Sequence, residues 1–277
     1  MRQIPAAAIT AVIAKLCRKA NCQLPTDVRH CLETFRQQEP WEPAREILDR
    51  IIENYNIAER DDCPICQDTG AACVFLKIGQ DVHIVGDLTE AVNQGVREGY
   101  VLLRKSLVSD PLRRVNTGDN TPAMLYTELV PGDKIEITVA PKGFGSENMS
   151  AIKMLRPSDG VDGVVDFVVQ TVKHAGPNPC PPIVVGVGIG GTFDKAAYLA
   201  KKALLRPLTD SHTDPYYAEL EQALLEKINA LGIGPQGFGG KTTALKVSIE
   251  TLPTHIAGLP VAVNINCHVT RHETEVL

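Results

Sequence analysis

The sequence lacks the features that mark secreted, membrane-spanning or nucleic-acid-binding proteins. It has no long basic run, and its 28 Lys and Arg are outnumbered by 33 Asp and Glu, so nucleic-acid binding is not expected. No apolar run is long enough to cross a bilayer. The first residues are interrupted by Lys15, Arg18 and Lys19, which predicts an amphipathic helix rather than a secretory signal. We therefore expect a cytoplasmic protein with no membrane partner.

Internal repeats and low-complexity linkers are also absent, so the 277 residues form one large domain or two small ones. Cysteine, by contrast, is plentiful. In an acidic chain without a secretion signal, thiols are expected to stay reduced and to serve as core residues or metal ligands. The eight cysteines lie at positions 17, 22, 31, 63, 66, 73, 180 and 267.

Hydrophobic periodicity predicts a helical start followed by alternating strands and helices. Residues 1–60 are expected to be helical, with Pro43 near a helix start. Strands are expected at 72–79, 81–86, 123–130, 134–140, 181–190, 244–251 and 259–268, and helices at 88–103, 159–176, 192–206 and 214–234. The predicted fold class is therefore α+β (mixed α/β), with a helical segment at 1–60 and a mixed-sheet α/β module at 61–277.

A glycine pattern spans the end of the predicted strand at 181–190 and the start of the next predicted helix. Gly186, Gly188 and Gly191 match G-x-G-x-x-G, the fingerprint of dinucleotide-binding folds. That fingerprint normally has an acidic residue at the end of a second strand about 20 residues later, and Asp210 follows no predicted strand. We expect the glycines to permit close contact between a helix and a strand, and a nucleotide-binding module is the alternative hypothesis.

The segment "GIGPQGFGGKTT" nearly matches a phosphate-binding P-loop. The motif requires glycine where this chain has Pro235, and no strand precedes the segment. We therefore expect a glycine-rich loop whose backbone amides meet a substrate or a neighbouring subunit.

The stretch "CPICQDTG" contains Cys63 and Cys66 two residues apart, followed by an amide, a carboxylate and a hydroxyl. A redox pair is one interpretation, although such pairs usually open a helix. A zinc site completed by His268 and His272 is another. Three isolated cysteines in separate loops would suit an iron–sulfur cluster with one iron open to substrate. Structural thiols throughout are the fourth possibility.

Six segments of the chain resemble those of class I fumarases, the iron–sulfur hydro-lyases. They run in order from residue 66 to residue 272, and several are long and unusual in composition. The segments are "CQDTG", "VNTGDNTPA", "PKGFGSEN", "NPCPPIVVGVGIGGT", "LGIGPQGFGGKTTALKV" and "NINCHVTRH".

The resemblance implies reversible hydration of fumarate to L-malate on a [4Fe-4S] cluster with one iron open to substrate. The family's cluster ligands fall on Cys66, Cys180 and Cys267.

The resemblance also implies roles for five further residues. Gln67 and Asp68 would meet the substrate, and Arg104 in "LRKS" would bind a carboxylate of the dicarboxylate through its planar guanidinium. Gly145 would lie close to the substrate. His255 would pair with Asp68 and move a proton.

The chain departs from single-chain members of that family in two ways. Cys63 adds a thiol three residues before the first expected ligand. We also expect the second domain, which in the single-chain enzymes supplies further arginines and the catalytic base, to belong to another chain. We therefore expect an α subunit that needs a separate β subunit, with αβ pairs forming an α2β2 assembly. The two-subunit L-tartrate dehydratases share several of the motifs and are the alternative, although the longer segments favour fumarate.

Overall fold

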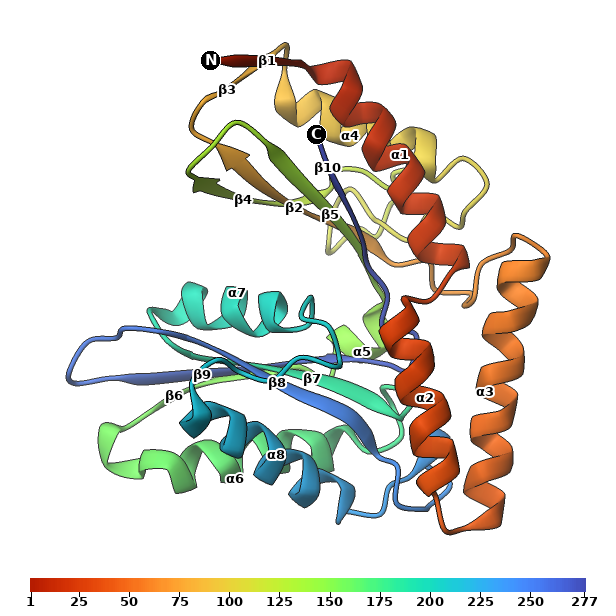
Figure 1. Cartoon of the computed structure of the whole chain (residues 1–277), viewed down its shortest axis with the longest axis vertical. Coiled ribbons are helices and arrows are strands. Elements are labelled where there is room, and N and C mark those ends of the chain that lie inside the picture. The colour runs from red at the N-terminus through yellow and green to blue at the C-terminus, as the bar shows by residue number, and fades with distance from the viewer. The chain divides into compact units, whose positions relative to one another are not determined.

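The computed structural model describes residues 1–277, and their contacts divide the chain into two compact units (Figure 1). The first unit consists of Met1–Pro25, Asn54–Phe144 and Arg271–Leu277, and the second of Thr26–Glu53 and Gly145–Thr270. The units are defined by contacts and do not test the sequence-based boundary at residue 60, which stays a prediction. The mixture of helices with mixed sheets confirms the α+β fold class.

The first unit is built on a four-stranded sheet in the order β10-β5-β2-β4. Its strands are β2 (Ala71–Gly79), β4 (Met124–Val130), β5 (Ile135–Lys142) and β10 (Glu273–Val276). A two-stranded sheet joins β1 (Arg2–Pro5) to β3 (Val82–Val85). Helices α1 (Ala6–Cys22) and α4 (Leu88–Gly99) pack on the main sheet, and their apolar faces form its core with alternate residues of β2 and β5.

Two local features of this unit match what the sequence pattern predicts, namely the buried face of β5 and the start of α4. Ile135, Ile137 and Val139 are fully buried on one side of β5, as their alternation predicts. The Asp87 side chain accepts a hydrogen bond from the backbone N–H of Glu90 at 2.9 Å, so Asp87 is the residue that caps α4.

The second unit has a four-stranded sheet in the order β6-β9-β7-β8 between helices. Its strands are β6 (Ala151–Leu155), β7 (Ile183–Gly190), β8 (Ala244–Leu252) and β9 (Leu259–Asn266). Helix α7 (Phe193–Ala203) covers one face, and α6 (Gly160–Ala175) and α8 (Pro215–Asn229) cover the other. Helix α2 (Thr26–Gln38) lies near β8. Helix α3 (Glu42–Arg60) follows α2 in the chain, and its residues from Asn54 onward belong to the first unit. A short helix, α5 (Phe144–Glu147), precedes β6.

The glycines of β7 let α7 approach the sheet closely. A Cβ atom on Gly186 would lie 2.1 Å from the carbonyl oxygen of Ala200, and one on Gly188 would lie 2.1 Å from that of Ala196. Both distances are far below van der Waals contact, so any side chain would push the helix away. The predicted close contact between helix and strand is confirmed, and it accounts for both glycines without a nucleotide.

Strands β1, β6 and β10 were not predicted from the sequence. Strand β10 pairs with β5, but its sequence "ETEV" carries charge where an apolar residue would signal a strand. Glu273 pairs with Lys19 and Glu275 with Lys15, each at 2.7 Å, so α1 supplies the partners of this edge strand. No helix of the chain has the length and apolar composition that a membrane crossing requires.

Candidate functional site

The "CQDTG" segment forms a tight turn in the first unit. The backbone N–H of Asp68 donates to the sulfur of Cys66 at 3.4 Å. The Asp68 carboxylate accepts hydrogen bonds from the backbone N–H groups of Gly70 at 3.0 Å and Phe144 at 2.8 Å. A Cβ atom on Gly143 would lie 3.2 Å from that carboxylate, so the absence of a side chain there gives Asp68 its room. The turn thus fixes both the thiol and the carboxylate.

The same turn is tied to the backbone of Arg104. The Thr69 hydroxyl donates to the carbonyl oxygen of Arg104 at 2.5 Å. The buried Tyr100 hydroxyl donates to the Thr69 carbonyl at 2.8 Å, and the Asn120 side chain donates to the Gly70 carbonyl at 3.1 Å. Arg104 itself is exposed. The structure therefore places the backbone of Arg104 beside the "CQDTG" turn, and the carboxylate-binding role of its side chain stays a prediction.

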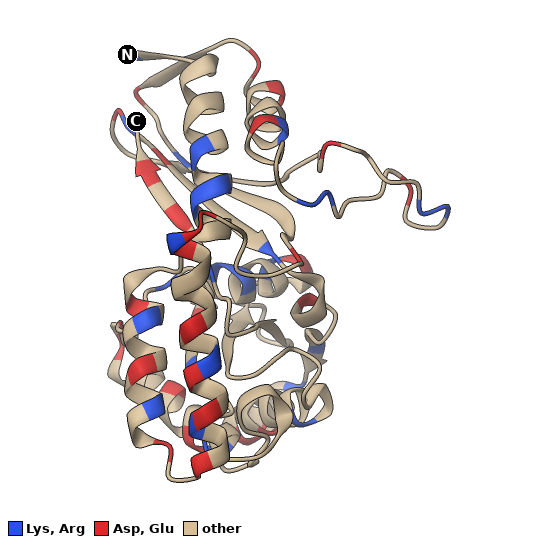
Figure 2. Ribbon diagram, turned by 90° about the vertical axis from the view of Figure 1, so that its right-hand side faces the viewer, with Lys and Arg blue, Asp and Glu red and all other residues tan.

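Two further features of this unit adjoin the turn. The exposed Gln67 side chain lies next to the Cys66 thiol, with 3.6 Å between the sulfur and the amide oxygen. A loop over residues 105–119 extends away from the sheet (Figure 2). Its two ends are held at Arg104 and Asn120, because Asn120 accepts hydrogen bonds from the backbone N–H groups of Ser106 and Leu107 at 2.8 and 3.3 Å.

In the second unit, three of the quoted motifs converge on Cys180. The carbonyl oxygen of Cys180 accepts a hydrogen bond from the backbone N–H of His268 at 3.3 Å, and the ring Nδ1 of His268 lies 3.0 Å from it. Gln236 donates to the carbonyl oxygen of Pro181 from its backbone at 2.7 Å and from its side chain at 2.8 Å. Since Cys267 directly precedes His268, the loops that carry Cys180 and Cys267 are joined.

Cys180 and Gln236 both adopt a left-handed backbone, with φ of 55° and 54°. Residues other than glycine and asparagine rarely adopt this backbone conformation. Where they do adopt it, they are often found at functional sites. Sequence reasoning missed the contribution of Gln236 and His268 to this cluster. The signal was present, because both residues lie inside motif segments that were identified for other reasons.

Gly145 and His255 are exposed residues of the second unit. A Cβ atom on Gly145 would meet only the carbonyl oxygen of Asn178, at 3.9 Å. The ring Nδ1 of His255 accepts the backbone N–H of Ala257 at 3.1 Å, which leaves the ring proton on Nε2. Asp68 belongs to the first unit, so its pairing with His255 stays a prediction.

The eight cysteines, all present as thiols, differ sharply in environment. Burial raises the pKa of Cys17 to about 12 and that of Cys31 to about 11. Such thiols stay protonated at neutral pH and are poor candidates for thiolate ligands. Cys66 and Cys267 are half-buried and Cys180 is exposed, and the Cys66 sulfur accepts a backbone N–H from Asp68.

No group of three or more His, Cys, Asp or Glu side chains in the structure forms a metal site. Cys66 belongs to the first unit, and Cys180 and Cys267 belong to the second. The donor chemistry of the three thiols fits an iron–sulfur cluster, and the ligand set stays a prediction.

The glycine-rich loop "GGKTT" is occupied by a carboxylate of the chain itself. The backbone N–H groups of Lys241 and Thr242 donate to the Glu39 carboxylate at 3.0 and 2.8 Å, and the Thr242 hydroxyl donates at 2.6 Å. Glu39 is 1% exposed. The expectation that these amides meet a substrate or a neighbouring subunit is therefore wrong for Lys241 and Thr242. The loop is an anion-binding nest filled from within.

Replacing Glu39 by glutamine should reduce the free energy of unfolding by about 2–3 kcal/mol at pH 7, because the amide opposes N–H donors with its own NH2 group. Desolvation raises the pKa of Glu39, but the hydrogen bonds from Thr242, Lys241 and Trp41 outweigh it and lower the pKa. A lowered pKa stabilises the fold above the unfolded-state pKa, and this stability is lost as the pH falls through the folded-state value. Denaturant unfolding should therefore show a difference that shrinks below about pH 4.

The exposed Glu46 provides the control for this experiment. Glu46→Gln should leave the free energy of unfolding nearly unchanged, both at pH 7 and below about pH 4. Equal stability of Glu39→Gln and the unaltered chain at pH 7 would contradict the interpretation.

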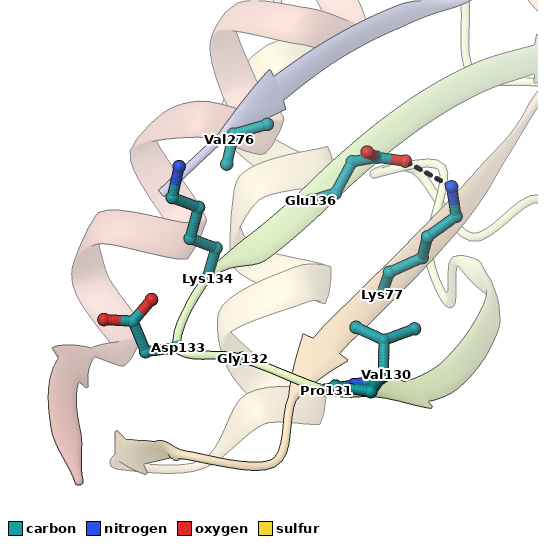
Figure 3. Close-up of a pocket in the computed structure, with 8 residues that line it drawn as sticks. All are labelled: Lys77, Val130, Pro131, Gly132, Asp133, Lys134, Glu136 and Val276. Atoms are coloured by element: carbon teal, nitrogen blue, oxygen red, sulfur yellow. Dashed lines mark ion pairs between the residues drawn. The ribbon is translucent and has the colours of Figure 1, made fainter.

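A hollow of about 460 Å³ lies in the first unit near the turn between β4 and β5 (Figure 3). Its lining includes Pro131, Gly132 and Lys134, together with an ion pair between Lys77 and Glu136 at 2.7 Å. None of the predicted site residues lines it. The hollow is therefore separate from the "CQDTG" turn.

Comparison with known proteins agrees with the motifs. The family model described as fumarate hydratase (Fumerase) matches residues 10–276. A protein of Methanocaldococcus jannaschii named "Putative L(+)-tartrate dehydratase subunit alpha" is 47% identical over 274 residues, which cover 95% of each chain. The L(+)-tartrate dehydratase subunit alpha of Escherichia coli K12 is 35% identical over 272 residues, or 96% of this chain and 89% of that protein. The chain therefore belongs to the fumarate hydratase (Fumerase) family.

Proposed function

We propose that this chain is the α subunit of a two-subunit iron–sulfur hydro-lyase that removes water from L(+)-tartrate. The geometric observation that supports a hydro-lyase is the "CQDTG" turn, which fixes Cys66 and Asp68 and is bonded to the backbone of Arg104. The substrate rests on the relatives, since two that match nearly the whole chain carry the name tartrate dehydratase subunit alpha.

Hydration of fumarate to L-malate is the second candidate. The description of the matching family and the segments "GFGSEN" and "NINCHVTRH" favour it. The sequence motifs alone ranked fumarate first, whereas the relatives favour tartrate. Both reactions move water across the central bond of a four-carbon dicarboxylate, so one arrangement of residues can serve either.

Cys66, Cys180 and Cys267 would hold the [4Fe-4S] cluster. When bound, such a group supplies a Lewis-acidic iron for the substrate hydroxyl. Three thiolates leave one iron without a protein ligand, which is the feature that a substrate-binding metal requires. The joined loops of Cys180 and Cys267 and the N–H bond to Cys66 support this ligand set.

The remaining site residues of this chain would bind and orient the substrate. The guanidinium of Arg104 can hold one carboxylate through two parallel hydrogen bonds. Gln67 would contact the substrate beside Cys66, and Gly145 would leave space for it. His255 would carry a proton on Nε2, and Asp68, held by two backbone amides, would be the carboxylate that orients the imidazole.

The chain would act with a β subunit, in αβ pairs that form an α2β2 assembly. The names of both relatives specify an alpha subunit, which supports a separate partner for this chain as well. The partner would supply the residues that complete the site, including the base that removes the carbon-bound proton.

Assays of the reconstituted enzyme test this proposal. The chain should be purified anaerobically, alone and together with its β subunit, and supplied with L(+)-tartrate or L-malate. We expect no turnover by the chain alone. With the β subunit, we expect kcat/KM for L(+)-tartrate to exceed that for L-malate at least about tenfold, a difference of about 1.4 kcal/mol in transition-state stabilisation. The opposite preference would establish the fumarate reaction, and full turnover by the chain alone would refute the need for a partner.

A further inference from the structure

Arg271 is a buried cation in the first unit with too few acceptors. The residue is 4% exposed, and its Nη2 atom donates to the carbonyl oxygen of Asp68 at 2.5 Å. Its Nε and Nη1 atoms are buried and have no hydrogen-bond partner. A guanidinium carries five N–H donors, so most of its hydrogen-bonding capacity is unused.

The charge of Arg271 is not paired with the Asp68 carboxylate, which accepts two backbone N–H groups instead. Arg271 forms no ion pair, and its electrostatic neighbours include Cys22 and Tyr100, both buried. Burial raises the pKa of Cys22 and that of Tyr100, so both side chains are neutral at neutral pH. The carbonyl of Asp68 contributes only a dipole.

Buried charges in proteins are almost always paired or bound to a ligand, because removing a charge from water is costly. A buried polar group without a partner therefore calls for an explanation, and a missing ion is among the usual ones. Here the orphaned cation is bonded to the turn that carries Cys66. Asp68 links the two, since its carbonyl accepts from Arg271 and its N–H donates to the Cys66 sulfur.

We propose that Arg271 is a positioning residue whose guanidinium offsets the negative charge of a thiolate-ligated cluster at Cys66. The inference rests on the proposed function. A [4Fe-4S]2+ core with three thiolates carries a net charge of about −1, which one guanidinium balances. The bond to the Asp68 carbonyl places the guanidinium beside the turn, and its charge compensates for that of the cluster.

A purely structural arginine would behave differently in one respect. If Arg271 served only to hold the Asp68 carbonyl, its removal would destabilise the protein with or without the cluster. If it balances the cluster, the unloaded protein contains an uncompensated buried charge, and removing that charge should not lower its stability. Removing the charge should then destabilise only the cluster-loaded protein, which should lose its cluster faster.

The experiment compares Arg271→Gln and Arg271→Lys with the unaltered chain. Each protein is loaded anaerobically with ferrous iron and sulfide. Iron per chain, the rate of cluster loss to a chelator, the midpoint potential and the unfolding temperature of the unloaded protein are measured. Arg2→Gln is the matched control, because the exposed Arg2 also donates to a backbone carbonyl in this unit, that of Asp133 at 3.1 Å.

We expect Arg271→Gln to lose its cluster at least about tenfold faster than the unaltered chain, with a more negative midpoint potential, because a nearby positive charge favours the reduced cluster. Its unloaded form should unfold at the same temperature or higher. Arg271→Lys keeps the charge and should retain the cluster within about threefold, and Arg2→Gln should match the unaltered chain.

Two results would overturn the inference while leaving the proposed function intact. One is unchanged cluster retention in Arg271→Gln. The other is equal cluster loss in both Arg271 variants with a lowered unfolding temperature of both unloaded proteins, which would establish a structural role. If the unaltered chain took up no more iron than Cys66→Ser, the proposed function itself would fail, and the Arg271 inference with it.

Discussion

Replacing Cys180 by serine should remove the cluster and abolish activity, and the same result is expected for Cys66→Ser and Cys267→Ser. Iron in such a cluster is bound by thiolates, and a serine hydroxyl remains protonated at neutral pH and is a far weaker ligand. Each variant should be prepared anaerobically, and its iron per chain, visible absorbance and turnover with the β subunit measured. Normal iron and activity in Cys180→Ser would refute the ligand assignment.

Two other cysteines provide the controls. Cys31→Ser should keep both iron and activity, because burial raises the pKa of this thiol to about 11 and it is unsuited to ligation. Cys63 lies three residues before Cys66 and is half-buried like it. If Cys63→Ser lost the cluster while Cys66→Ser kept it, the ligand of the pair would be Cys63. The N–H bond from Asp68 to the Cys66 sulfur is the structural reason to expect the opposite.

Replacing His255 by asparagine should lower kcat by about 10²–10⁴, the usual range for a lost general acid or base, while the cluster and fold remain. Asp68→Asn should have a similar effect. Its carboxylate accepts one N–H from Gly70 and one from Phe144, so an amide at this position would also turn an NH2 group toward one of these donors. Turnover should be measured in the reconstituted enzyme at full iron occupancy.

The double variant separates a coupled pair from two independent residues. If Asp68 and His255 act as a unit, the double variant should be little slower than either single one, because such residues are strongly non-additive. The exposed His30 on α2 supplies the control, and His30→Asn should leave kcat unchanged. Wild-type kcat in His255→Asn would disprove the proton-transfer role and leave the cluster assignment standing.

Local sequence patterns were sufficient for most of the elements. The alternation of Ile135, Ile137 and Val139 marked β5. Thr89 or Asp87 was expected to begin α4, and the structure selects Asp87. Gly186 and Gly188 indicated close packing between helix and strand, which α7 confirms. These features depend on residues within a few positions of one another. They are therefore visible as a hydrophobic pattern that repeats every 2 residues in a strand or every 3.6 residues in a helix. The motif segments added the family, because they are long and occur in a fixed order.

Tertiary structure decided how distant polar groups are satisfied. Glu39 fills the loop that resembled a phosphate site from 203 positions away along the chain, and Arg271 reaches Asp68 across the same separation. Neither pairing leaves a trace in periodicity, because a hydrogen bond depends on atoms within about 3 Å in space, whatever their distance in sequence. The burial of a polar residue likewise depends on contacts in space and not on its neighbours in the sequence. A glutamate and an arginine are ordinarily surface residues, and only the folded chain shows that Glu39 is fully paired while Arg271 is left with unused donors.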